Sequence, residues 1–206
     1  MFGISRKTRL ILASKSPRRA EILRNAGFEF SVHPTHADET RHGRESAREY
    51  VQRLASTKAR VAATHAKQRN HRAMVIGADT AVIVRGKILG KPTDVREARR
   101  MLRALSGRTH EVLTGISILT VPGGGEWHHV ESTRVRFAKM TAAEMNDYIA
   151  TGEPFDKAGG YGIQGIGGRF VERIDGCYFN VMGLPISRVW TLLKKAGWDS
   201  EAVRSR

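Results

Sequence analysis

The sequence lacks several features that define whole classes of protein. Its 206 residues include a single cysteine, Cys177, so no disulfide forms within the chain and a reducing cytoplasm is the expected location. It has no apolar run of about 18 residues, so no transmembrane helix is expected. Residues 1–9 are basic but lack the apolar stretch of a signal peptide. Aromatic residues make up only 7%, and no strand carries the aromatics of an RNA-binding sheet.

Acidic residues are also scarce relative to basic ones. The 35 Lys and Arg residues outnumber the 20 Asp and Glu residues, which gives a formal net charge of +15. Such a charge favours polyanionic partners, whether nucleic acid, an acidic membrane surface or a small phosphorylated substrate. The excess is spread along the chain rather than gathered in one tail, so the charge alone predicts only nonspecific contact with nucleic acid.

The length and pattern predict one α/β domain over residues 1–206, with a core over 9–197 and loose ends at 1–8 and 198–206. In the helix predicted over 46–66, Val51, Leu54, Val61 and His65 fall on one stripe that also contains Lys58. Helices mixed with strands and a hairpin around 122–125 predict a mixed sheet. Predicted strands cover 10–13, 28–32, 74–84, 111–121, 127–137 and 170–174, and the other predicted helices cover 17–26, 95–106, 141–152 and 185–195.

The junction between the first strand and the first helix has the composition of an anion site. Ser16 suits the N-cap and Pro17 the first helical position. The helix N-terminus, the hydroxyl of Ser14 and the guanidinium groups of Arg18 and Arg19 together suit an oxyanion, most naturally a phosphate. An ordinary strand–turn–helix junction with solvated arginines is the alternative.

Asp79 lies in the middle of an apolar strand, where a carboxylate is costly unless it meets a cation, a metal or a ligand. It is therefore a candidate general base, and a structural ion pair is the equal alternative. Lys58 lies among core-facing positions, which is uncommon for a lysine unless its ammonium group is paired or reaches water.

Three further segments carry weaker signals. Asp38-Glu39 offers two hard oxygen ligands for Mg²⁺, although exposed acidic loops are common. Lys91 in a short turn suits a phosphate or is merely solvated. Asp156-Lys157 precedes a glycine-rich segment that can approach a nucleotide closely. The chain contains neither a P-loop nor a GxSxG elbow, and its histidines lack strong metal spacing.

Taken together and in order, these motifs resemble the Maf family of nucleoside triphosphate pyrophosphatases, from Leu10 to about Gly197. The motifs that carry the resemblance are Ser14-Lys15-Ser16-Pro17-Arg18-Arg19, Asp38-Glu39, Ala55-Ser56-Thr57-Lys58-Ala59, Gly77-Ala78-Asp79-Thr80, Gly90-Lys91-Pro92 and Tyr161-Gly162-Ile163-Gln164-Gly165.

The resemblance implies two α/β lobes around a long mixed sheet with a central cleft, a fold related to the inosine triphosphate pyrophosphatases. It also implies a cytoplasmic homodimer that cleaves a nucleoside triphosphate to the monophosphate and pyrophosphate, a house-cleaning reaction. By the same resemblance Asp79 is the proton acceptor, and Asp38 and Glu39 hold Mg²⁺ or Mn²⁺. Substrate contacts are expected from Ser14, Arg18, Arg19, Lys58, Thr80, Lys91, Asp156, Lys157 and Gln164.

Arg18, Thr80 and Gln164 correspond to the specificity positions of the family. Gln164 resembles the branch that acts on dTTP and UTP, whereas the branch that prefers 7-methyl-GTP usually has a glutamate there. An amide both donates and accepts, so it matches a pyrimidine carbonyl and its N3–H together. A nucleic-acid-binding or cell-division (septum) regulator with little catalysis is the alternative function.

Overall fold

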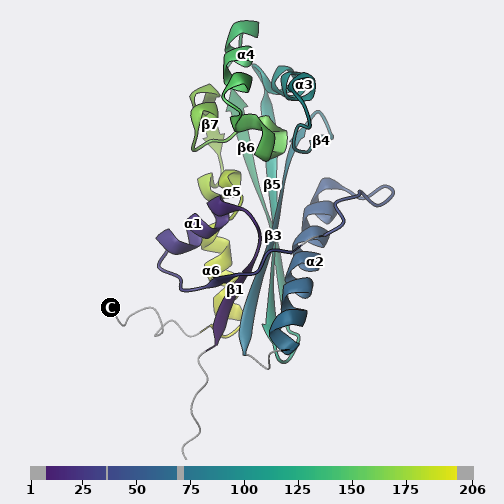
Figure 1. Ribbon diagram of the computed structural model, residues 1–206, viewed down its shortest axis with the longest axis vertical. Helices are drawn as coiled ribbons and strands as arrows, with labels where there is room; N and C mark the ends of the chain where they lie inside the picture. Colours follow the sequence, from purple (N-terminus) through teal and green to yellow (C-terminus); the bar gives the residue numbers. More distant parts are fainter. Residues whose placement is uncertain (1–7, 36, 69–71, 199–206) are drawn as a thin grey trace, which may run out of the picture. The chain divides into compact units, whose positions relative to one another are not determined.

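The computed structural model describes residues 8–35, 37–68 and 72–198 (Figure 1). Of the predicted loose ends, only Thr8 and Trp198 lie within these ranges. The backbone N–H of Trp198 donates to the Leu193 carbonyl at 2.9 Å, directly after the last helix. In the described part of the chain, no helix is both long and apolar enough to cross a bilayer.

The protein has a mixed α/β fold, as the sequence predicts. Its hydrogen-bonded strands follow the order β2-β1-β3-β5-β6-β7, with β4 paired to β3. The strands are β1 (Arg9–Ala13), β2 (Ser31–Val32), β3 (Ala73–Val84), β4 (Lys87–Leu89), β5 (Thr109–Val121), β6 (Glu126–Phe137) and β7 (Val171–Asp175). The helices are α1 (Pro17–Asn25), α2 (Ala47–Gln68), α3 (Val95–Leu105), α4 (Ala142–Ala150), α5 (Tyr178–Met182) and α6 (Ile186–Lys195).

The chain divides into two compact units. The first unit comprises Met1–Asp79, Gly115–Val130 and Ile186–Arg206, and the second comprises Thr80–Thr114 and Glu131–Pro185. Strand β1 pairs in parallel with both β2 and β3 in the first unit, which places Ala13 beside Gly77. In this unit α1 and α6 lie on one side of the strands and α2 on the other (Figure 1).

The buried face of α2 is shifted from the face that the sequence pattern predicts. Val51, Leu54 and Lys58 are buried, but Val61 is 37% exposed and His65 also faces solvent. The prediction that Val61 and His65 belong to the buried stripe is therefore wrong. The face that packs on β1 and β3 consists of small side chains, namely Ala59, Ala62, Ala63 and Ala66.

Glycine in the strands explains this choice of face. A Cβ added at Gly77 would lie 2.1 Å from the Ala55 carbonyl oxygen, and one at Gly115 would lie 2.4 Å from the Val51 carbonyl oxygen. The backbone of α2 thus lies directly on the sheet at both positions, which only glycine permits. Alanines suit so close an approach, whereas β-branched or aromatic side chains would hold the helix away.

The second unit is built around α3 and α4, and its helix starts follow the sequence closely. Asp94 caps α3 by accepting from the Glu97 N–H at 2.7 Å. Thr141 and Glu144 form the predicted reciprocal capping box of α4. The core of this unit gathers apolar side chains from its strands and helices, namely Val82, Val84, Ala98, Leu102, Leu105, Val112, Val135, Phe137, Met145, Tyr148 and Ile149.

Two further details of the prediction differ from the structure. The strand predicted over 28–32 forms only at Ser31–Val32, and the short helix α5 was not predicted. Within α5, the fully buried Asn180 donates to the Val112 carbonyl and to the Thr133 hydroxyl, each at 2.9 Å. These contacts are made to strands that are distant in sequence, so the local sequence pattern does not predict the helix.

Candidate active site

A buried ion pair between Asp79 and Lys58 forms the centre of the candidate site. The Lys58 ammonium Nζ lies 2.6 Å from Asp79 Oδ1, and the two residues are only 9% and 8% exposed. The close packing of α2 at Gly77 brings Lys58 to this position, because Gly77 precedes Asp79 by two residues on β3. A lysine on the buried stripe is thus explained by its partner on the sheet.

Arg19 supplies a second buried cation, and its position corrects one local prediction. Its Nη1 donates to the Ser14 hydroxyl at 3.1 Å and to the Ala78 carbonyl at 2.9 Å. Ser16 is the N-cap residue and Pro17 occupies the first turn of α1, both as predicted, but the Ser16 side chain makes no capping bond. Instead the Ser14 hydroxyl accepts the Ser16 N–H at 3.2 Å, so the hydroxyl before the helix serves the arginine and the turn together.

In this cluster, burial and the neighbouring opposite charges shift the pKa values in opposite directions. Burial raises the pKa of Asp79, while the nearby Lys58 and Arg19 act against that rise. Burial also lowers the pKa of the Arg19 guanidinium, and Asp79 opposes this change. A carboxylate that is more basic than a surface aspartate, yet held beside two cations, suits proton abstraction next to an anionic substrate.

The neighbouring carboxylates of Asp38 and Glu39 make different contacts. Glu39 Oε1 lies 3.4 Å from Lys58 Nζ, so Glu39 and Asp79 flank the same ammonium group. Asp38 instead accepts the Thr40 N–H at 2.8 Å, and hydrogen bonding first to the Thr40 side chain and then to this N–H lowers the pKa of Asp38. Within the described ranges, no group of three or more His, Cys, Asp or Glu side chains gathers as a metal site.

The two carboxylates on Lys58 still fit a hard cation. Mg²⁺ in nucleotide enzymes usually takes only one or two protein carboxylates, and phosphate oxygens and water complete its shell. Glu39 has a 62% exposed side chain and can meet an incoming ion, whereas Asp38 is engaged with its own turn. The donor set therefore fits a metal that arrives with its substrate rather than a resident ion in a closed cage.

The other predicted substrate contacts belong to the second unit. The Thr80 hydroxyl lies 2.9 Å from the Thr114 hydroxyl and donates to the Gly183 carbonyl at 3.5 Å. Lys157 Nζ lies 2.5 Å from Asp156 Oδ1 and donates to the Glu153 carbonyl at 2.8 Å. Lys91 and Gln164 are exposed. Their participation in one site with Asp79 stays a prediction.

The segment that carries Gln164 is held by a residue that the sequence analysis missed. Glu153 accepts the Tyr148 hydroxyl at 2.8 Å, the Ile166 N–H at 2.8 Å and the Gly167 N–H at 3.1 Å. A Cβ at Gly165 would lie 2.3 Å from Glu153 Oε2. The glycines predicted to approach a nucleotide therefore also make room for this carboxylate.

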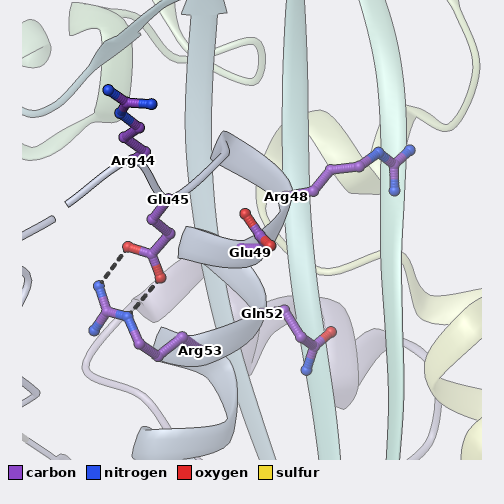
Figure 2. A pocket seen from close by; sticks show the side chains of 6 residues that line it. All are labelled: Arg44, Glu45, Arg48, Glu49, Gln52 and Arg53. Atoms are coloured by element: carbon purple, nitrogen blue, oxygen red, sulfur yellow. Dashed lines mark hydrogen bonds and ion pairs between the residues drawn. The ribbon is translucent and has the colours of Figure 1, made fainter. Parts of the chain in front are cut away.

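Two residues of α2 near Glu39 were also missed. Tyr50 and Arg53 contact the 38–45 loop, and Figure 2 shows the Arg53 guanidinium paired with the Glu45 carboxylate at the end of that loop. The sequence does not indicate this role, because the loop that they bind lies outside the helix and its contacts do not follow helical periodicity. Arg18, the remaining predicted contact, is half-buried, and its charge further lowers the pKa of Arg19.

Comparison with known proteins gives a consistent result. A family model described as Maf-like protein matches residues 9–196. The chain belongs to this family. A dTTP/UTP pyrophosphatase of Anaeromyxobacter sp. (strain Fw109-5) is 49% identical over 199 residues, 93% of each chain. A dTTP/UTP pyrophosphatase of Geobacillus sp. (strain WCH70) is 50% identical over 189 residues, 92% of this chain and 98% of its own.

The likeness to solved structures is weaker. A nucleoside-triphosphatase / dITP/XTP pyrophosphatase from Mycobacterium abscessus ATCC 19977 / DSM 44196 is 17% identical and covers 66% of this Maf-like chain, with a TM-score of 0.39. This partial overlap has no bearing on the reaction. The family resemblance drawn from the motifs is thus confirmed by the family model and by the sequence relatives.

Proposed function

We propose that this Maf-like protein is a nucleoside triphosphate pyrophosphatase that acts on dTTP and UTP. The observation that carries the proposal is the buried Asp79, which pairs with Lys58 and lies near enough to Arg19 for that charge to act on its pKa, in a chain about half identical to relatives named for that activity. A structural aspartate needs one cation, whereas a triphosphate site needs an excess of positive charge that remains when the substrate is present.

In the proposed reaction, Asp79 takes a proton from water as the water oxygen attacks the α phosphorus. The bond between the α phosphorus and the bridging oxygen breaks, and pyrophosphate leaves with the bonding electron pair. Arg19 and Lys58 stabilise the growing negative charge, and Ser14 keeps the Arg19 guanidinium in place. Glu39 would hold Mg²⁺ or Mn²⁺, and the predicted role of Asp38 as a second ligand would require it to release the Thr40 N–H. The ion would shield the phosphate charge and favour pyrophosphate departure.

The decisive measurement is the product released from dTTP and UTP by the purified protein with Mg²⁺ or Mn²⁺. We expect pyrophosphate rather than orthophosphate, and no release after the metal is removed by chelation. Asp79→Asn should lower kcat by roughly 10²–10⁴-fold while the protein stays folded. Asp147→Asn, at an exposed aspartate of α4, is the matched control. Orthophosphate as product, or normal turnover by Asp79→Asn, would contradict the proposal.

Specificity is proposed to rest on Arg18, Thr80 and Gln164, with Lys91, Asp156 and Lys157 as further substrate contacts. Loss of the Gln164 amide removes one hydrogen-bonding pair, so Gln164→Ala should reduce the preference for dTTP over GTP by about 10-fold. Competition between the two nucleotides in one reaction measures this ratio. An unchanged ratio would show that the base is selected elsewhere.

Assembly and location are proposed on the same family basis. We expect a homodimer, which sedimentation velocity would test, and a cytoplasmic location. A regulator that binds nucleic acid would retain high affinity for DNA at physiological salt. A pyrophosphatase with a net charge of +15 should instead lose that binding as salt rises, because only nonspecific phosphate contacts hold it.

A further inference from the structure

Two side chains of α2 bind three consecutive backbone carbonyl groups around Glu39. Arg53 donates to the carbonyl of Asp38, with Nη1 at 3.5 Å, and to that of Thr40, with Nη2 at 3.0 Å. The Tyr50 hydroxyl donates to the carbonyl of Glu39 itself at 3.0 Å. The backbone on both sides of Glu39, and at Glu39, is thus tied to one helix.

Arg53 is itself fixed in orientation by Glu45. Its Nε lies 2.7 Å from Glu45 Oε1, and its Nη2 lies 3.0 Å from Glu45 Oε2 (Figure 2). The guanidinium carbon also lies 5.6 Å from the centre of the Tyr50 ring, within the range of a cation–π contact. Glu45 closes the loop, since its Oε2 accepts the His42 N–H at 3.2 Å.

This arrangement needs an arginine rather than any cation. A guanidinium presents five N–H donors in a rigid plane, so it can serve a carboxylate and two carbonyls at the same time. A lysine carries the same charge but offers its donors from a single nitrogen. Tyr50 remains a neutral hydroxyl donor across the working range, because burial and the nearby Asp79 raise its pKa to about 12.

Glu39 depends on this support more than the other charged residues of the site. Its side chain is 62% exposed and approaches the Lys58 ammonium group at 3.4 Å. An exposed side chain is placed chiefly by its backbone, so movement of the 38–40 backbone displaces the carboxylate directly. Lys58 and Asp79 are held by packing and need no such support.

We propose that Arg53 and Tyr50 are positioning residues that hold the Glu39 carboxylate beside Lys58 and thereby set the affinity of the site for its divalent cation. This inference rests on the proposed function, in which Glu39 holds the cation. Neither side chain contacts the reacting atoms. Both act through the loop backbone, as the outer partners of metal ligands do in other sites.

The first test is the Mn²⁺ dependence of pyrophosphate release. Arg53→Lys keeps the charge but loses the planar fork, so the Mn²⁺ concentration for half-maximal rate should rise about 10–100-fold. The rate at saturating Mn²⁺ should fall much less. Tyr50→Phe, which removes one hydrogen bond, should shift the curve in the same direction by less. An unchanged Mn²⁺ curve for Arg53→Lys would overturn the proposal.

The matched control lies two turns along the same helix. Arg60→Lys also breaks a bidentate contact, here to Glu126 Oε2 at 3.1 Å and 2.7 Å, but it does not touch the loop. Its Mn²⁺ curve should match that of the wild type. In a Glu39→Gln background, Arg53→Lys should add no further shift, because the ligand that it positions is already lost. Full additivity of the two changes would overturn the proposal.

Two readouts separate this inference from the proposed function. Hydrogen exchange of the amides over 40–45 should become faster in Arg53→Lys and not in Arg60→Lys, whatever reaction the protein catalyses. Electron paramagnetic resonance of Mn²⁺ with a non-hydrolysable dTTP analogue should show weaker binding by Arg53→Lys. If the wild type releases no pyrophosphate, the proposed function fails, and these two measurements still decide the role of Arg53. Unchanged exchange and unchanged Mn²⁺ binding would overturn it.

Discussion

Two loops that carry predicted ligand contacts are anchored by groups of opposite charge. In the first unit, the cationic Arg53 binds the carbonyl oxygens around Glu39. In the second unit, the anionic Glu153 binds the N–H groups of Ile166 and Gly167, next to Gln164. Each anchor also satisfies a side chain, Glu45 in the first case and Tyr148 in the second.

The two anchors differ in how they respond to pH. A guanidinium stays charged at every pH at which the protein is folded, so the 38–40 carbonyls keep their donor in acid. Its partner Glu45 can take up a proton, but the bond to Arg53 lowers the pKa of Glu45. A carboxylate can take up a proton. Burial raises the pKa of Glu153, but the bonds from the Gly167 N–H and the Tyr148 hydroxyl outweigh this effect and lower it. The anchor of the second unit therefore holds at neutral pH and weakens in acid, below the ordinary value of 4.5.

Of the two anchors, the second-unit anchor should contribute more to stability. Glu153→Ala leaves the buried Tyr148 hydroxyl and two N–H groups without their acceptor, which should lower the free energy of unfolding by about 2–3 kcal/mol. Arg53→Ala should cost less, about 1–2 kcal/mol, because the exposed 38–40 carbonyls can bind water instead and the main loss is the partner of Glu45, whose side chain is 8% exposed. Urea unfolding at pH 7 compares them, and the reverse order would show that the two anchors are not distinguished by burial.

Acid should weaken the second unit further through His110. This residue is 2% exposed, its Nε2 lies 2.7 Å from the Tyr161 hydroxyl, and burial lowers its pKa from 6.5 to about 4. Between these two pH values, His110 binds a proton in the unfolded chain but not in the folded protein. Stability should therefore be constant above pH 6.5 and fall by up to about 3 kcal/mol as the pH drops toward 4.

His110→Gln should flatten this pH dependence, whereas His65→Gln, at an exposed position of α2, should leave it unchanged. Urea unfolding at several pH values between 4.5 and 7 measures the slope. Equal slopes for the wild type and for His110→Gln would assign the acid sensitivity to other groups.

A smaller contrast is expected between two glycines, one in each unit. An added Cβ at Gly77 meets the Ala55 carbonyl of a rigid helix at 2.1 Å, so Gly77→Ala should cost about 1–3 kcal/mol and reduce activity by displacing Lys58. At Gly165 the obstacle is the carboxylate end of Glu153, at 2.3 Å, which can shift only by straining the bonds that it accepts from Tyr148, Ile166 and Gly167. Gly165→Ala should cost about 1 kcal/mol, less than the full loss of those bonds in Glu153→Ala.

Thermal unfolding with parallel activity assays separates the two glycines. Gly90→Ala serves as the control for stability, since a Cβ there meets nothing within 4 Å. A larger loss at Gly165 than at Gly77 would mean that Glu153 is more rigidly held than its contacts indicate.

The helices and strands of this fold depend on patterns of neighbouring residues, and for that reason the sequence alone predicts them well. The capping box at Thr141 and the buried strand around Asp79 each depend on neighbours within a few residues. The need of Asp79 and Lys58 for buried partners also follows from their positions in apolar patterns. The family is predictable for a different reason, because it rests on several motifs in a fixed order.

Tertiary structure alone decided the contacts that join these patterns. The α2 stripe contains Val61 in the sequence, yet the buried face follows the alanines because Gly77 brings the two backbones together. Ser14 rather than Ser16 serves the start of α1, because Arg19 reaches back to it. Arg53 and Glu153 are ordinary charged residues until folding brings a loop to each. A side chain's local propensity is a property of its neighbours in sequence, whereas its partner across the fold is fixed only when distant backbones approach.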